Sequence, residues 1–99
     1  MFNNKRYITI GIEREIPLWL MSYMWNRVDV ICKRLKENTD YLQIFKLSTN
    51  NGELLIEHTQ EQPPLNECIR IKYQGKSINQ KIYVIDDEEY STMLLAEEY

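Results

Sequence analysis

Residues 17–36 carry the only long helical pattern in this chain of 99 residues, and the rest of the sequence must supply a core for that helix. Pro17 suits the first turn of a helix, where its missing N–H costs nothing, and Asn38 suits the end. At about 100° per residue, the main apolar side chains fall within one arc of about 140°, which is typical of a helix lying on a core. They are Leu20, Met21, Met24, Trp25, Val28, Ile31, Cys32 and Leu35.

A second, narrower apolar arc lies on the same helix. It consists of Trp19, Tyr23 and Val30, and Arg27 borders it. Aromatic residues and arginine are enriched at the hot spots of protein interfaces. We therefore predict that these four residues bind a partner, which includes a second copy of the chain as one candidate. The alternative is that the chain's own C-terminal segment or Phe2 covers this arc.

The remaining segments read as strands separated by turns. Alternating apolar and polar residues and β-branched side chains predict strands over residues 6–12, 40–47, 53–58, 68–73 and 81–85. Asn50-Asn51-Gly52 predicts a tight hairpin turn, because Asn and Gly tolerate positive φ. The sequence thus predicts one α+β domain over residues 1–99. Its mostly antiparallel sheet of about five strands is covered by one long amphipathic helix, with a short C-terminal helix. The alternative for the C-terminal segment is an extended edge segment over residues 91–95.

The C-terminal segment has an unusual charge. Six of the fifteen acidic residues lie at positions 86–99, whereas all twelve basic residues precede position 82. Asp86, Asp87, Glu88 and Glu89 are consecutive, and acids at this point suit the N-terminus of a helix. Such asymmetry usually concerns what a chain contacts, so we predict that these four acids also bind a partner.

Few residues are candidates for catalysis or metal binding. His58 is the only histidine, and we expect a lone histidine on a strand to lie at the surface. With no second histidine and no Cys-x-x-Cys motif, a zinc site lacks its ligands. Cys32 lies within the apolar arc, where we expect a buried, inert thiol. There is also no glycine-rich phosphate loop. The sequence therefore predicts neither an enzyme nor a cofactor.

Composition indicates the cellular compartment and argues against some kinds of partner. No signal peptide is visible, and no apolar stretch is long enough to span a membrane, so we expect a cytoplasmic protein without a membrane partner. The net charge of −3 counts against nucleic acid as a partner. Four basic residues fall in the predicted strand region, where such residues are more often only the solvated face of a sheet; the alternative is a modest basic patch. These four are Arg70, Lys72, Lys76 and Lys81.

Several segments resemble a known protein family. They are FNNKRYITIGI, IPLWL followed by Trp25, DYLQIFKL, and the closing KIYVIDDEEYSTMLLAEEY. Together they resemble the bacterial domain-of-unknown-function family 960, over essentially the whole chain. The resemblance implies a small cytoplasmic protein of Gram-positive bacteria, often carried on mobile genetic elements beside recombinase and replication genes. It implies no activity, cofactor or catalytic residue.

Three functions are compatible with these features. The leading hypothesis is a non-enzymatic accessory protein of a mobile element that binds a protein partner, for example one that processes DNA. The alternative is an inhibitor whose acidic segment mimics nucleic-acid phosphates and blocks a DNA-processing or defence protein. The third is a weak single-stranded nucleic-acid binder that uses aromatic residues on an exposed sheet face.

Overall fold

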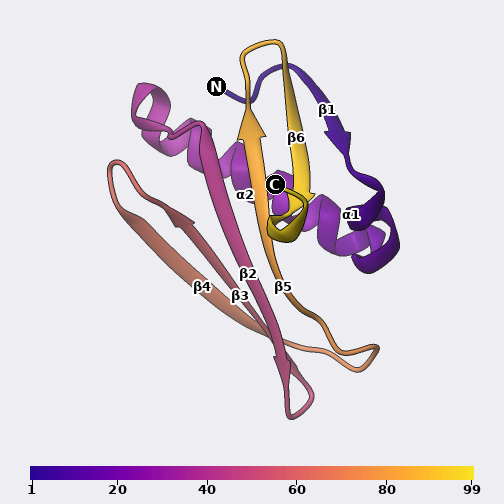
Figure 1. Cartoon of the computed structure of the whole chain (residues 1–99). Coiled ribbons are helices and arrows are strands. Elements are labelled where there is room, and N and C mark those ends of the chain that lie inside the picture. The colour runs from indigo at the N-terminus through magenta and orange to yellow at the C-terminus, as the bar shows by residue number, and fades with distance from the viewer.

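The computed structural model describes residues 1–99 and has one sheet with one long helix across it (Figure 1). Short turns of 3₁₀ helix, η1 (Lys36–Asn38) and η2 (Ala96–Glu98), follow α2 and β6. In chain order the other elements are β1 (Lys5–Ile8), α1 (Ile10–Glu15), α2 (Leu18–Leu35), β2 (Leu42–Asn50), β3 (Glu53–Gln60), β4 (Leu65–Lys72), β5 (Asn79–Asp86) and β6 (Tyr90–Leu95).

The sheet has six strands in the order β1-β6-β5-β2-β3-β4. β1 pairs with β6 in parallel, and the other pairings are antiparallel. The α+β class is confirmed, but the prediction of about five strands is corrected to six in a mixed sheet. β1 and β6 lie side by side at one edge, and β4 forms the other (Figure 1).

The long helix α2 confirms the prediction for residues 17–36 and builds the core. It runs over one face of the sheet, and the short turn η2 lies on the other side (Figure 1). Five of the eight residues in the predicted apolar arc are buried, and the other three are half-buried. Phe45, Leu54 and Val84 meet α2 from the sheet and are fully buried. No helix has the length and apolar character needed to cross a membrane.

The predicted hairpin forms between β2 and β3. Asn50 pairs with Glu53, which leaves Asn51 and Gly52 as a two-residue turn. Their φ angles of 50° and 76° are both positive, as the tightest hairpin turns require. Asn and Gly adopt this conformation at little cost, so local sequence alone sets the register of this pair.

The strand predicted over residues 6–12 is shorter than expected. β1 ends at Ile8, and Ile10–Glu15 forms helix α1. The hydroxyl of Thr9 caps this helix by accepting from the N–H of Ile12 over 3.3 Å. The isoleucines at 8, 10 and 12 alternate as in a strand, but the N-cap ends the strand and turns Ile12 into the core.

The predicted C-terminal helix is wrong, because residues 90–95 form strand β6. Ser91, Met93 and Leu95 alternate along this strand and are all buried on the α2 side. The same residues also fit a helical spacing, so periodicity over six residues could not decide between the two. The acidic run does not start a helix but forms the turn between β5 and β6.

Candidate functional site

The second apolar arc of α2 lies along the edge strand β4. Arg27 and Arg34 both form ion pairs with Glu67 of β4. Further along, the ring of Trp19 lies 6.2 Å from that of Tyr73, just after the end of β4. Hydrogen bonds from Arg34 and Arg27 lower the pKa of Glu67 to about 2, so this carboxylate stays ionised and holds both arginines. α2 and β4 are therefore fixed beside each other.

Apolar side chains remain uncovered along this line. Trp19 is 46% exposed and Ile69 of β4 is 41% exposed; Val30 is also exposed, and Tyr23 is half-buried. Neither segment expected to cover them does so. Phe2 is buried in the core, and β6 is paired between β1 and β5. The predicted partner-binding residues thus keep an accessible surface, although Arg27 is engaged within the chain.

The backbone of β4 has one unpaired side. The N–H of Tyr73 donates to the carbonyl of Gly52 over 2.9 Å, so this residue's backbone faces β3. Antiparallel pairing alternates, which turns the backbone of Ile69 toward β3 and that of Cys68 and Arg70 outward. Cys68 lies near the middle of the outward series. Such a row of free N–H and C=O groups is a template for another strand.

A cavity of about 260 Å³ opens between α2 and this edge. It combines apolar walls with a few charged or polar groups, as ligand-binding pockets commonly do. Its lining residues are Tyr23, Arg27, Ile56, His58, Glu67, Cys68 and Ile69. The cavity therefore joins the predicted aromatic arc to the free edge of the sheet.

His58 lines this cavity and is only 2% exposed. Its ring stacks on Phe45, with centroids 4.2 Å apart. The side-chain amide of Gln43 donates to the carbonyl of Asp40 and to the side-chain oxygen of Gln60. Gln43 Oε1, 2.7 Å from His58 Nε2, is therefore left as an acceptor. His58 must carry its proton on Nε2.

The other ring nitrogen, Nδ1, is buried and has no hydrogen-bond partner. It is an acceptor in this tautomer, and it is the one polar ring atom not engaged with Gln43. Burial, and next the positive charge of Arg27, lower the pKa of His58 to about 4. An unpaired buried acceptor is unusual in a native protein and is a candidate contact for a bound donor.

The expectation that His58 lies at the surface is therefore wrong. The signal was present in the sequence, because His58 continues the alternation of Leu54 and Ile56, both buried. Gln60 completes the series and is buried as well. The register of the strand, not the residue type, indicates where this side chain lies.

The acidic run is divided by the turn that contains it. Asp86 is buried and accepts from the N–H of Phe2 over 2.7 Å, from the amide of Asn4 over 2.9 Å and from the N–H of Glu88 over 2.8 Å. Burial alone would raise the pKa of Asp86, but these hydrogen bonds lower it overall. Asp87, Glu88 and Glu89 are exposed. Asp87 also accepts from the N–H groups of Glu89 and Tyr90 within the turn, but all three exposed acids remain accessible to a partner.

The two cysteines lie in different surroundings. Cys32 is half-buried, its Sγ donates to the carbonyl of Met1 over 3.3 Å, and burial raises the pKa of its thiol. Cys68 is exposed on β4. No group of three or more His, Cys, Asp and Glu side chains is arranged to hold a metal ion. The binding features of the site are its edge, its aromatic flank and the cavity.

Two comparisons extend over nearly the whole chain. A family model described as "Staphylococcal protein of unknown function (DUF960)" matches residues 5–98. A similar solved structure is the crystal structure of a protein of unknown function from Enterococcus faecalis. It has a TM-score of 0.81 and 25% sequence identity, and the match covers 98% of this chain and 92% of that chain. No curated protein gives a significant match.

Proposed function

For a chain that belongs to the DUF960 family, as its sequence motifs predict, we propose a non-enzymatic module that binds an extended segment of a protein partner along the edge of β4. The observation that carries the proposal is the combination of an unpaired edge strand with a cavity beside it. β4 offers eight residues of edge, and the cavity of about 260 Å³ lies between that edge and α2.

Strand addition explains the arrangement of this site. Main-chain hydrogen bonds to the outward groups of β4 would provide affinity, and a pocket for alternate side chains would provide selectivity. Trp19 and Ile69 flank the edge and would cover the added strand from the α2 side. An added strand therefore pairs the free backbone and buries the exposed apolar side chains at the same time.

His58 adds a chemical preference to the cavity. Its Nδ1 accepts but does not donate, and it is buried, so a partner group reaches it only if the cavity wall moves. A partner side chain with an N–H or O–H group on an apolar body would satisfy this acceptor while contacting Tyr23 and Ile56. Tyrosine, tryptophan and threonine have this character.

The wider setting of the proposal comes from the family resemblance. We propose that the protein is cytoplasmic and acts as an accessory protein of a mobile genetic element, with a partner that processes DNA. The acidic-mimic alternative has less support from the geometry, because two of the six acids of the C-terminal segment are engaged within the chain. Asp86 is buried and accepts from Phe2, and Glu98 accepts from Thr9 and Leu95. Charge reversal of Asp87, Glu88 and Glu89 tests that alternative separately.

The test uses a library of random peptides displayed on phage, selected against the wild-type protein. Enriched peptides are then measured against Cys68→Pro and Cys68→Val. Proline at this position removes an outward N–H and leaves the pairing with β3 intact, while valine removes only the thiol. Trp19→Ala with Tyr23→Ala is the third variant, and it also serves in affinity purification from cells.

We expect Cys68→Val to bind like the wild type, and Cys68→Pro to lose most of the affinity. The double alanine variant should lose affinity too, because it removes the aromatic flank. Equal binding by the proline and valine variants would rule out strand addition at this edge. If the double alanine variant recovers the same partners as the wild type, the α2 face is not part of the site.

A further inference from the structure

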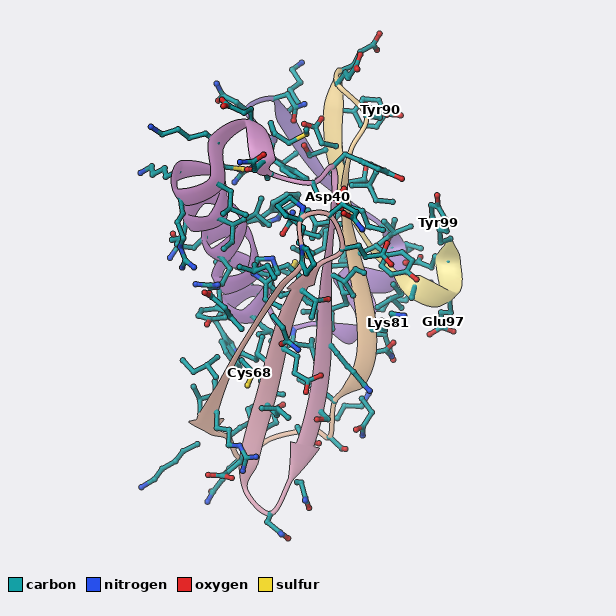
Figure 2. All side chains as sticks on the ribbon, turned by 90° about the vertical axis from the view of Figure 1, so that its left-hand side faces the viewer. Asp40, Cys68, Lys81, Tyr90, Glu97 and Tyr99 are labelled. Atoms are coloured by element: carbon teal, nitrogen blue, oxygen red, sulfur yellow. The ribbon has the colours of Figure 1, made fainter.

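The face of the sheet opposite α2 is partly covered at β5 and β6, where Leu94 is 9% exposed and Tyr99 meets Tyr83, and basic side chains are exposed along β2, β4 and β5. Pairing places Lys81, Lys46 and Glu57 side by side across β5, β2 and β3 on this face. The neighbouring row toward the β2–β3 turn ends on Arg70 of β4. Toward the opposite end of the strands, a row that crosses β2, β5 and β6 ends on Tyr7 of β1. In Figure 2, Lys81, Tyr90 and Tyr99 lie on the side of the sheet away from α2.

Four tyrosines lie on this face in two pairs. Tyr7 and Tyr90 meet edge to face with centroids 5.5 Å apart, and Tyr83 and Tyr99 do so at 5.6 Å. Tyr7 is 50% exposed and Tyr90 is 42% exposed. Tyr7 lies two inter-strand spacings across the sheet and two residues along it from Tyr83, so their backbones are about 12 Å apart by the ordinary spacing of a sheet. The pairs are therefore two separate aromatic platforms.

The strand residues of this face carry a charge opposite in sign to that of the chain. Two acids, Glu53 and Glu57, stand among five basic residues on the strands, which gives 5 − 2 = +3 before the acids of the β5–β6 turn and of η2 are counted, whereas the whole chain has −3. The basic residues are Lys5, Lys46, Arg70, Lys72 and Lys81, and all five are exposed. The net charge of the sequence averages over two different surfaces and does not describe this one.

We infer that this face binds single-stranded nucleic acid. Unpaired bases stack on exposed aromatic rings, and phosphates are attracted to a row of lysine and arginine side chains. Lys81 Nζ lies 5.6 Å from the centre of the ring of Tyr83, which is half-buried and also meets Tyr99, so a cation stands beside the part of this ring that stays accessible. The site is separate from the β4 cavity, which lies on the α2 side of the sheet.

Acidic residues limit where the strand can run. Asp87, Glu88 and Glu89 form the turn just before Tyr90, and Glu97 precedes Tyr99 by two positions. These carboxylates repel phosphates at the tyrosine end of the face. The backbone of the nucleic acid is therefore expected to follow Lys81, Lys46 and Arg70, with bases directed toward Tyr83. A rigid duplex does not offer unpaired bases to this arrangement.

The test is fluorescence anisotropy with a labelled single-stranded oligonucleotide of mixed sequence at 50 mM salt. We expect a Kd on the order of 10 µM, within the range of binding driven by phosphate contacts. Lys46→Gln with Lys81→Gln should make the slope of log K against log salt shallower by about 1.4, since each phosphate contact on a single strand contributes about 0.7. Tyr83→Leu should weaken binding at least about fivefold.

The matched control is Lys33→Gln with Lys76→Gln, which removes the same charge from exposed positions outside this face. It should change neither the slope nor the affinity by more than the measurement error. No anisotropy change at 100 µM wild-type protein would overturn the inference. An equal loss in the two lysine variants would also overturn it, because the binding would then not belong to this face. Thermal melting checks that every variant is folded.

Discussion

At the scale of single residues, His58 shows how neighbouring side chains determine chemistry. Gln60 orients the amide of Gln43, and Gln43 in turn determines which nitrogen of His58 carries the proton. The ring is thus held as a neutral acceptor in a buried position. The network is supported by the backbone as well, because Gln60 donates to the carbonyls of Asn38 and Pro63. A buried polar group so held is sensitive to protonation.

Stability should therefore fall between pH 7 and pH 5. The pKa of His58 is about 4 in the folded state and about 6.5 when unfolded, so the unfolded chain binds more protons in this window. The stabilisation is complete above pH 6.5 and is lost as the pH falls toward 4. Linkage gives a decrease of about 2 kcal/mol in the free energy of unfolding from pH 7 to pH 5, measured by urea denaturation.

His58→Phe is the control for this decrease. Phenylalanine retains the aromatic contact with Phe45 but has no proton to bind, so its free energy of unfolding should be almost flat between pH 7 and pH 5. The variant should be less stable at pH 7, because the oxygen of Gln43 loses its donor. A wild type and a variant with the same pH dependence would contradict the buried neutral histidine.

Asp86 is expected to contribute more to stability than its three acidic neighbours. Asp86→Ala leaves the N–H of Phe2 without an acceptor and should cost about 2–3 kcal/mol in the free energy of unfolding. Glu89→Ala removes an equal charge from an exposed side chain and should stay within about 0.5 kcal/mol. Urea denaturation of both variants measures the difference, and equal losses would show that charge alone matters here.

At the scale of elements, local signals decided which predictions succeeded. α2 and the β2–β3 hairpin have strong local sequence patterns, a long apolar arc and an Asn-Gly turn, and the prediction of both elements is confirmed. α1 and β6 have six residues each, and over so short a span an alternating and a helical pattern overlap. Their type depends on a cap at Thr9 and on a partner strand, which local periodicity does not contain.

The register of β4 predicts losses of different size for proline at two adjacent positions. Cys68 directs its backbone outward, so Cys68→Pro should lower the free energy of unfolding by only about 1 kcal/mol. Ile69 directs its backbone toward β3, so Ile69→Pro removes a ladder hydrogen bond and should cost about 3 kcal/mol or more. Thermal unfolding measures both. Equal losses, or the reverse order, would mean that the outward face of β4 is misassigned.

At the scale of the whole molecule, the order of the sheet brings the two ends of the chain together. β1 and β6 pair in parallel although more than eighty residues separate them. Neither the sixth strand nor the mixed pairing follows from local sequence, since a short strand is defined by the partner it finds. The candidate site has the same origin. Trp19 and Tyr23 were identified from the helix alone, but the edge and the cavity beside them depend on where β4 lies.

Phe2 links the N-terminal segment to the core and to the C-terminal part of the chain. The side chain of Phe2 is 1% exposed among the core residues, and its N–H is bound by Asp86 at the far end of the chain. Phe2→Ala should therefore lower the free energy of unfolding by about 3–5 kcal/mol, as for a large aromatic residue in a central core position. Phe2→Leu keeps most of the volume and should lose less than about 1.5 kcal/mol. Urea denaturation measures both; a small, equal loss would mean that the sheet and α2 form a complete core without the N-terminal segment.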